Sequence, residues 1–347
     1  MDSLEFYPSL FKYLTVFIGV IVSFWALFRR PRVPKGFAII LLFVIAIILG
    51  LIPEDSAVCY RDRPRYLYLF LVGEDRTAIT DIGFLLYVRI CRFFFGGNYH
   101  LFFILSGLIY VYGYYVFCRD SVDNDLFFTI LFITCLLSAG FMNYGVNTMR
   151  SGLALSVYLT AYGAELRGKQ KLSYSLMFLA CLVHISLLLP VVCHFISRIK
   201  VPLYWFYLFW VLMLIITIIN VFEPMVSLVE SMQIDRLVNY MGDEESTYNS
   251  GFRTDFVLYS LLPIIASHYY IFMKKINNPV YERLVKQYIL INAIWLLFIR
   301  MVYTDRFAYL SWFMIPFVLM VPLTDKRMDR RYISAVILFF IAFKFIV

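Results

Sequence analysis

Long apolar runs alternate along this chain with short polar segments. A helix needs roughly 17 to 25 predominantly apolar residues to cross the hydrocarbon core of a bilayer. From these runs we predict about ten transmembrane helices, at 8–28, 36–52, 99–117, 126–142, 150–166, 202–222, 256–273, 284–301, 306–323 and 332–346. The pattern therefore indicates an all-α polytopic integral membrane protein, with residues 1–347 forming a single transmembrane domain.

The composition excludes a soluble globular protein. Hydrophobic residues make up 62% of the chain and charged residues only 16%, whereas a soluble domain carries about 25% charged residues. The net charge of +8 does not indicate a nucleic-acid partner, because the cationic residues gather in short loops between apolar runs. Such clusters are typical signals of membrane topology.

The distribution of Lys and Arg predicts the orientation of the chain. Cytoplasmic loops carry an excess of these residues. Four loops meet that description, with four, three, four and four cations at 29–35, 167–171, 274–286 and 326–331. With ten spans, both termini then lie on the outer side.

Residues 172–197 do not fit a simple span. The loop charges place both ends of this segment inside, so it must enter and leave on the same side. Two helices of about 12 residues reach only about 18 Å each, less than the thickness of the hydrocarbon core. We therefore expect a bent or re-entrant helix pair with its apex near His184, because irregular backbone at membrane depth requires a protein or water-filled environment.

Two outward segments, 53–98 and 223–255, exceed ordinary connector length, and long connections often carry function. Within the first, residues 81–93 form an amphipathic pattern that predicts a helix lying along the membrane interface. Cys59 and Cys91 also fall in this segment, and their spacing leaves open whether they pair.

Arg150 is the single formal charge between Leu126 and Ala164. An ionised guanidinium in an apolar stretch costs about 2.5–3.5 kcal/mol even on lenient insertion scales, so such residues usually have a task. Asn143, Asn147 and Arg150 would share one face of a continuous helix. That face suits a sugar or a phosphate, although Asn147 could instead be only the N-cap of the span that follows.

Several further arginines fall on the outer side, where positive charge is scarce. Arginine binds phosphate oxygens in planar, bidentate contacts. These residues therefore favour a phosphate-bearing ligand, with headgroup anchoring and surface ion pairs as the alternative. The candidates are Arg61, Arg63, Arg65, Arg253, Arg300 and Arg306, to which the turn at 300–309 adds Asp305 and Tyr309.

His184 could act as a general base, since imidazole exchanges protons near neutral pH. The alternative is a packing histidine on an apolar run. The sequence contains no glycine-rich phosphate loop, no HExxH and no CxxC pair, and no Asp-x-Asp pair offers an evident metal site. We therefore expect no metal and no cofactor.

The motifs resemble the EpsG/Wzy-type polysaccharide polymerases. The resemblance rests on Asn147-x-x-Arg150-x-Gly152-x-Ala154, on His184-Ile185-Ser186 about 30 residues later, on Asp62-x-x-x-Tyr66 and Asp81-Ile82-Gly83-Phe84 upstream, and on the late Arg306-x-x-Tyr309. It covers roughly 60 to 320. The family often has Gln where this chain has Ser151 and Glu where it has Asp81, and the glycine-rich lead-in to Asp62 is missing.

The resemblance implies a multi-pass glycosyltransferase of the bacterial inner membrane with periplasmic termini. It would polymerise polyprenyl-pyrophosphate-linked oligosaccharide repeat units into capsular, exo- or O-antigen-type polysaccharide, with a chain-length regulator as a further partner. Arg150 would hold the pyrophosphate, and His184 would act as base, with Asp62 as the alternative base. Tyr66 and Tyr309 would contact sugar rings. The alternatives are a flippase or transporter of the same lipid-linked oligosaccharide and a membrane O-acyltransferase.

Overall fold

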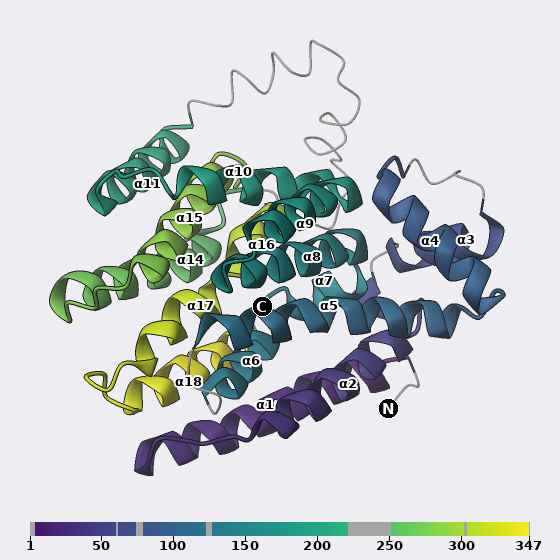
Figure 1. Ribbon diagram of the computed structural model, residues 1–347, viewed down its shortest axis with the longest axis horizontal. Helices are drawn as coiled ribbons and strands as arrows, with labels where there is room; N and C mark the ends of the chain where they lie inside the picture. Colours follow the sequence, from purple (N-terminus) through teal and green to yellow (C-terminus); the bar gives the residue numbers. More distant parts are fainter. Residues whose placement is uncertain are drawn as a thin grey trace. The chain divides into compact units, whose positions relative to one another are not determined.

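The computed structural model describes residues 4–59, 62–73, 79–122, 127–220, 251–301 and 304–346. Every regular element in these ranges is helical (Figure 1). Four helical segments are long and apolar enough to cross a membrane, namely Phe6–Phe28, Tyr99–Ser121, Thr254–Met273 and Thr304–Thr324. The predicted all-α membrane fold is confirmed, whereas the number of ten transmembrane helices stays a prediction.

The chain divides into two compact units, which we describe separately. Unit 1 contains residues 1–191 and 323–347, and unit 2 contains residues 192–322. The prediction of a single transmembrane domain is not tested by this division.

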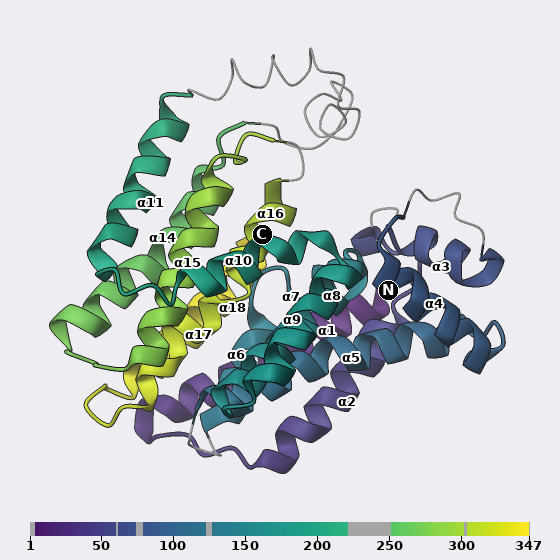
Figure 2. The same ribbon diagram turned by 45° about the horizontal axis from the view of Figure 1, so that its top comes forward.

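Unit 1 is built around a row of helices in which α2 packs on α5, α5 on α8, and α8 on α9 (Figures 1 and 2). Beside this row, α1 packs on both α18 and α6. The elements of unit 1 are α1 (Phe6–Phe28), α2 (Lys35–Leu51), η1 (Ala57–Cys59), α3 (Asp62–Val72), α4 (Ile82–Phe95), α5 (Tyr99–Ser121), α6 (Phe127–Leu137), α7 (Phe141–Val146), α8 (Met149–Leu166), α9 (Gln170–Val183), η2 (Ile185–Leu187) and α18 (Arg331–Ile346).

In unit 2, α11 packs on α15, which also contacts α16. Indole and amide groups hydrogen-bond within this core, as where Trp210 Nε1 donates to Asn292 Oδ1 at 2.8 Å. Its elements are α11 (Leu203–Ile218), α14 (Thr254–His268), η3 (Tyr269–Met273), α15 (Pro279–Leu296), α16 (Thr304–Trp312) and α17 (Ile315–Met320). The short helices α10 (Leu188–Ile196) and η4 (Val321–Thr324) join the two units in sequence.

Several predicted spans coincide with single helices, but others are interrupted. The run expected at 126–142 contains α6 and only the first two residues of α7, which are separated around Gly140, whose φ of 79° is left-handed and ends a helix readily. The span expected at 306–323 lies within the helical segment Thr304–Thr324, in which a short turn separates α16 from α17, whose first turn contains Pro316. The segment 172–197 breaks at His184, where its apex was predicted. That this segment enters and leaves on one side stays a prediction.

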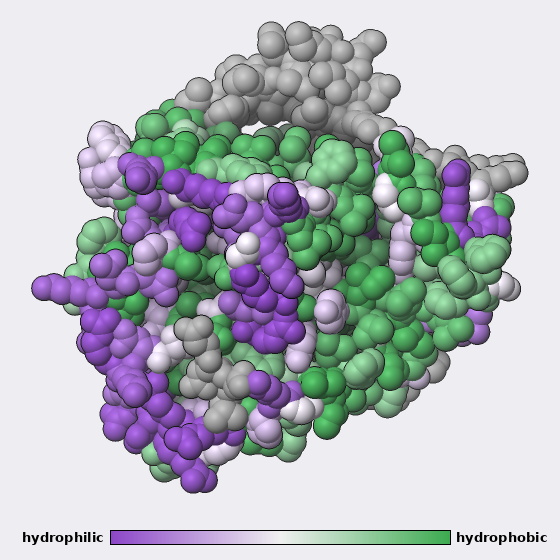
Figure 3. Space-filling view, in the orientation of Figure 1, coloured by the Kyte–Doolittle hydropathy of each residue, from purple (hydrophilic) through white to green (hydrophobic). Residues whose placement is uncertain are grey.

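The predicted amphipathic helix is present as α4. Its buried side chains are Phe84, Val88 and Cys91, whereas its exposed face carries Arg89 together with five large apolar side chains, Ile82, Leu86, Ile90, Phe93 and Phe94. Figure 3 shows a broad hydrophobic surface over the part of unit 1 that contains α4 and α5. A position of α4 at the membrane interface agrees with this surface but stays a prediction.

Candidate functional site

Three ionisable side chains from distant parts of the sequence meet in unit 1. Arg150 Nη1 donates to Asp81 Oδ2 at 2.6 Å, and the other carboxylate oxygen of Asp81 lies 3.7 Å from His184 Nδ1. The side chains of Arg150, Asp81 and His184 are 27%, 11% and 21% exposed, so all three are largely but not fully removed from solvent. Asp81 thus connects the two residues predicted to carry the chemistry.

All three residues lie where a helix begins or is interrupted. Asp81 is the N-cap of α4, Arg150 is the second residue of α8, and His184 separates α9 from η2 in an extended conformation. A helix N-terminus carries a partial positive charge and unpaired N–H groups. The start of α4 therefore favours the Asp81 carboxylate, and the start of α8 adds to the positive potential around Arg150.

Two glycines allow these helix ends to approach each other. A Cβ on Gly83 would lie 2.8 Å from the carbonyl carbon of Leu182 and 2.9 Å from the amide nitrogen of Val183. The first turn of α4 can therefore contact the last turn of α9 only without a side chain at that position. A Cβ on Gly152 would collide with the carbonyl oxygen of Tyr144 in α7. Both glycines belong to motifs that the sequence singled out.

Replacing Gly152 with Ala is expected to destabilise the protein by about 1–3 kcal/mol, the usual cost of inserting a group into packed structure. Since the colliding atom is backbone, α8 must shift and Arg150 must move with it. The midpoint of thermal unfolding in detergent measures this effect. Gly36→Ala is the matched control, because a Cβ there meets no atom within 4 Å; equal midpoints for both variants would contradict the proposed contact.

Tyr66 completes the surroundings of Arg150. Its ring centroid lies 5.9 Å from Arg150 Cζ, and its hydroxyl is a hydrogen-bond partner of the guanidinium. The ring is 3% exposed and packs edge-on against Phe84 of α4, with the centroids 5.5 Å apart. Tyr66 therefore joins α3 to the site, and its contact with a sugar ring stays a prediction.

The imidazole of His184 has two neighbours at Nδ1. The amide N–H of Ser186 donates to Nδ1 at 3.5 Å, and the Asp81 carboxylate lies 3.7 Å away. Both contacts are longer than a typical hydrogen bond. They also make opposite demands, because the amide requires a bare Nδ1 and the carboxylate requires a protonated one. A small movement of the ring toward Asp81 would fix the tautomer that leaves Nε2 as the acceptor.

The predicted stripe of Asn143, Asn147 and Arg150 on one continuous helix is wrong. Asn147 is the C-cap of α7 and Thr148 the N-cap of α8, so the chain turns between the amides and the guanidinium. The alternative role of Asn147 as N-cap is also wrong, since Thr148 holds that position. The break arises where the carbonyl of Asn143 accepts hydrogen bonds from the amides of both Asn147 and Thr148.

The polar atoms beside this break lack partners. Within the described residues, the side-chain oxygens of Asn143 and Asn147 and Nε of Arg150 are buried and make no hydrogen bond. A buried polar group without a partner costs free energy, and each such group calls for an explanation such as water or a ligand. Asn143 and Asn147 therefore leave unsatisfied polar atoms at the break that precedes Arg150, and a ligand bound there could satisfy them.

The predicted arginine group at 61–65 does not act as one unit. Arg63 is 1% exposed and donates to the carbonyls of Leu49 (3.1 Å) and Gly50 (2.7 Å) at the end of α2. Burial lowers its pKa to about 10, so it remains charged at neutral pH. Arg65 is 61% exposed and lies 3.9 Å from Asp62. Arg61 falls outside the described residues.

We predict that Arg63 stabilises the fold. In Arg63→Gln, the carbonyls at the end of α2 lose their charged donor, and the free energy of unfolding should fall by about 1–3 kcal/mol. Arg65→Gln is the control, with an expected change within about 0.5 kcal/mol because its side chain is exposed. Equal thermal midpoints in detergent would show that the contacts of Arg63 with α2 contribute nothing.

Unit 2 holds a second polar cluster, made of predicted residues. Arg253 donates to Asp255 at 2.6 Å and lies 3.8 Å from the ring centroid of Phe256. Asp305 and Tyr309 are hydrogen-bonded, and both act electrostatically on Arg253. Arg300 Cζ lies 5.5 Å from the ring centroid of Phe252, and Arg306 acts on the neighbouring Asp305. The acidic segment at 242–245 lies outside the described residues.

Asp81 is the site residue that the sequence interpretation missed. It was assigned only to the start of an amphipathic helix and to a short motif. The usable signal was electrostatic, because a guanidinium in an apolar stretch requires a nearby anion. Asp81 begins an otherwise apolar turn and belongs to the same resemblance as Arg150.

The cysteines do not form a site. All six are free, including Cys59 and Cys91. Burial raises the pKa of the Cys59 thiol to about 11, which keeps it protonated at neutral pH. Among the described residues, no group of three or more His, Cys, Asp or Glu side chains could hold a metal ion.

Comparison with known proteins gives one match. No curated protein and no solved structure matches this chain. The sequence profile of the EpsG family, in contrast, matches residues 40–347, which include all three residues of the Asp81–Arg150–His184 site. This match covers most of the chain, which therefore belongs to the EpsG family.

Proposed function

We propose that this protein is a polysaccharide polymerase of the bacterial inner membrane. It would join polyprenyl-pyrophosphate-linked oligosaccharide repeat units on the periplasmic face, forming capsular, exo- or O-antigen-type polysaccharide. The observation that carries the proposal is the contact of Arg150 and His184 with one carboxylate, Asp81, in a polar site within an all-α membrane protein. Family membership supports the polymerase class.

The guanidinium of Arg150 would bind the pyrophosphate. Its Nη1 is held by Asp81, whereas its Nε has no hydrogen-bond partner among the described residues. Arginine presents five N–H donors in a rigid plane, so one edge can bind a carboxylate while another binds phosphate. The N-terminal end of α8 would add its own positive potential. Both effects favour the charge that develops on a pyrophosphate leaving group.

His184 would act as the general base. In a single displacement, an acceptor hydroxyl of one repeat unit attacks the anomeric carbon of the growing chain. The new glycosidic C–O bond forms as the bond to pyrophosphate breaks, and the hydroxyl proton passes to His184 Nε2. Asp81 would orient the ring through Nδ1, because a carboxylate there stabilises the tautomer with a bare Nε2. Asp62 remains the alternative base.

The topology predicted from the loop charges supports this assignment. It places the start of α8 and the His184 break on the outer side, with ten spans and both termini periplasmic. Lipid-linked repeat units presented on that side would reach the site from the bilayer. In unit 2, the predicted contacts with phosphate or sugar stay with Arg253, Arg300, Asp305, Arg306 and Tyr309. A chain-length regulator is a proposed partner.

Glycan length analysis in a strain lacking this chain tests the function. We expect single lipid-linked repeats on the periplasmic leaflet and no polymer, with polymer restored by the wild-type chain. The purified protein in liposomes that contain lipid-linked repeats should then form a ladder of products. Accumulation of repeats on the cytoplasmic leaflet would contradict the proposal and favour a flippase. Full-length polymer lacking acyl groups would contradict it in favour of an O-acyltransferase.

A further inference from the structure

Tyr66 lies in the middle of a buried face of α3. Arg63, Tyr66 and Phe70 follow one another at intervals of three and four residues, and each is at most 3% exposed. This spacing aligns side chains along one side of a helix. Arg63 lies in the first turn of α3 and Phe70 in the last, so Tyr66 is placed between two buried neighbours on the same element.

Contacts at both ends of α3 fix its position. The guanidinium of Arg63 donates to two carbonyls at the end of α2. The ring of Phe70 stacks on Phe102 of α5, with the centroids 4.7 Å apart and the planes inclined by 14°. Because α3 is attached to α2 at its first turn and to α5 at its last, the side chain of Tyr66 is held in one place.

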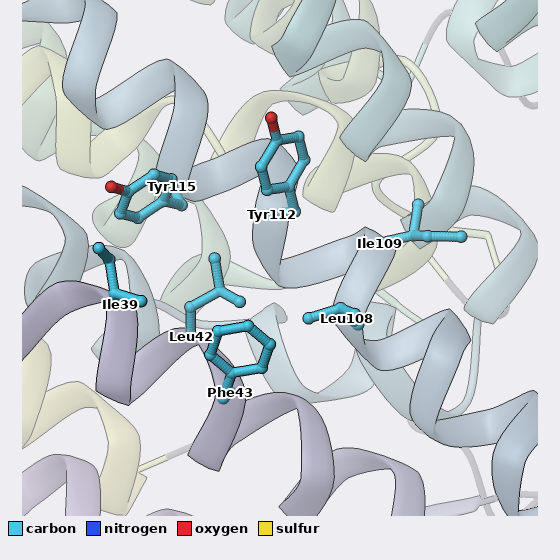
Figure 4. A pocket seen from close by; sticks show the side chains of 7 residues that line it. All are labelled: Ile39, Leu42, Phe43, Leu108, Ile109, Tyr112 and Tyr115. Atoms are coloured by element: carbon cyan, nitrogen blue, oxygen red, sulfur yellow. The ribbon is translucent and has the colours of Figure 1, made fainter.

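The two helices that carry α3 are themselves in close contact there. A Cβ on Gly50 of α2 would lie 2.6 Å from Cα of Ile104 in α5, so the two backbones touch. A pocket of about 440 Å³ between the same helices lies further along, where Phe43, Leu108 and Tyr112 line it (Figure 4). The base on which α3 rests is therefore packed at the end where α3 binds.

Burial leaves the ring of Tyr66 little surface for a ligand. Its edge packs against Phe84 of α4, which is fully buried. A ring that stacks on a sugar needs one face open. The hydroxyl is the polar part of this residue, and a buried tyrosine hydroxyl usually has a hydrogen-bond partner. Here that partner is the guanidinium of Arg150.

Two acceptors hold the guanidinium of Arg150. Its Nη1 donates to the Asp81 carboxylate at 2.6 Å, and the hydroxyl oxygen of Tyr66 is the second acceptor, since a guanidinium carries donors only. With one acceptor the planar group can pivot about that contact. With a second acceptor on a different helix its plane is fixed. Nε is left buried and without a partner among the described residues.

We propose that Tyr66 is a positioning residue, whose hydroxyl holds the Arg150 guanidinium in the plane in which its remaining N–H groups bind the pyrophosphate. This inference rests on the proposed polymerase function. Donors that are already oriented stabilise developing charge without reorganisation during the reaction, and a displacement of about 1 Å in such a group can cost roughly 100-fold in rate. Asp81 supplies the counter-charge of Arg150, and Tyr66 fixes its direction.

The inference gives the outward segment at 53–98 a part in the reaction. Both acceptors of the guanidinium belong to it, Tyr66 on α3 and Asp81 at the start of α4. Arg150 itself belongs to α8. The segment therefore determines the orientation of a charged group that another helix supplies.

Solution NMR of the full-length protein in detergent, with isotope-labelled arginine, tests the contact. The signals of Arg150 are identified by their absence in Arg150→Lys. We expect separate Nη signals for Arg150 in the wild type, because a guanidinium held by two acceptors rotates slowly, and broadened or merged signals in Tyr66→Phe. Tyr87→Phe is the matched control: it removes another phenol of unit 1, bonded to Ser106 at 2.8 Å, and should leave the Arg150 signals unchanged.

The kinetics of ladder formation in liposomes test the role in the reaction. Tyr66→Phe should lower kcat by roughly tenfold, the effect of one hydrogen bond to a charged group. KM should change by less than about twofold, because the hydroxyl acts on charge that develops in the transition state. In the Arg150→Lys background, Tyr66→Phe should change kcat by less than about twofold, since the group that it positions is absent. Tyr87→Phe should keep the kcat of the wild type.

Three results would overturn the inference. The first is an unchanged set of Arg150 signals in Tyr66→Phe. The second is a wild-type kcat in Tyr66→Phe, which agrees with a sugar contact that phenylalanine preserves. The third is an equal loss of kcat with and without Arg150, which indicates a general structural effect. A wild type that forms no ladder would instead contradict the polymerase function, and altered Arg150 signals in Tyr66→Phe would still support the contact.

Discussion

Replacing Arg150 with lysine is expected to reduce polymer formation by roughly 10²–10³-fold, the loss typical of removing one preorganised donor that stabilises developing charge. Lysine keeps the positive charge but presents a single ammonium in place of a planar group with five N–H donors. It can therefore pair with Asp81 or with a pyrophosphate oxygen, but it cannot hold both in a fixed plane. The rate of ladder formation from lipid-linked repeats in liposomes measures this loss.

The control for Arg150→Lys is Arg89→Lys on α4. Arg89 is exposed and lies on the helix that Asp81 begins, so its replacement should leave the rate of ladder formation near that of the wild type. If Arg150→Lys also retains near-normal activity, then Arg150 serves only as the structural partner of Asp81. That outcome would contradict the proposed role of Arg150 in pyrophosphate binding and would not affect the family assignment.

Replacing Asp81 with asparagine is expected to lower activity on the order of 10²-fold, comparable to the loss of a preorganised electrostatic contact. Asparagine has a similar shape but no charge, so Arg150 loses its ion pair and His184 loses the anion beside Nδ1. Leaving a largely buried guanidinium unpaired should also cost about 1–3 kcal/mol of stability. Activity per folded molecule and the thermal midpoint in detergent separate the two effects.

Asp81→Glu is the informative companion to Asp81→Asn. Glutamate restores the charge and can still reach Arg150, so it should recover both stability and a large part of the activity. Full activity of Asp81→Asn, with only the midpoint lowered, would mean that the carboxylate holds the fold and has no part in the reaction. Loss in both variants would show that the position of the carboxylate matters as much as its charge.

Much of the fold was predictable because long, apolar runs of sequence identify membrane helices. The runs at 8–28, 36–52 and 99–117 correspond closely to α1, α2 and α5. The interrupted spans were harder, since hydropathy does not respond to one residue of unusual backbone geometry. Gly140 breaks an apolar run without changing its polarity. The break at His184 was predicted from charge balance, which gave information that hydropathy could not.

The site was predictable in its members but not in its arrangement. Arg150 and His184 stood out because each is chemically unusual for its surroundings, and the structure brings both to one carboxylate. The prediction that Asn143 and Asn147 share a helix face with Arg150 was wrong. It assumed one continuous helix, whereas the chain turns between α7 and α8, and no Gly or Pro at this turn indicates it in the sequence. The prediction that Arg63 belongs to an outer group of phosphate-binding arginines was also wrong, because its N–H groups donate to carbonyls at the end of α2, which only the packing shows.

The 69 positions that separate Asp81 from Arg150 have a consequence for biogenesis. A chain that inserts from its amino terminus presents Asp81 at the membrane before the helix that carries Arg150 has left the ribosome. Until Arg150 arrives, the Asp81 carboxylate is an unpaired anion at the start of α4, where the helix dipole stabilises it. On the predicted topology, in which 150–166 is a span, the guanidinium would meet a counter-charge already in position as this helix enters the bilayer, which would lower the cost of inserting it.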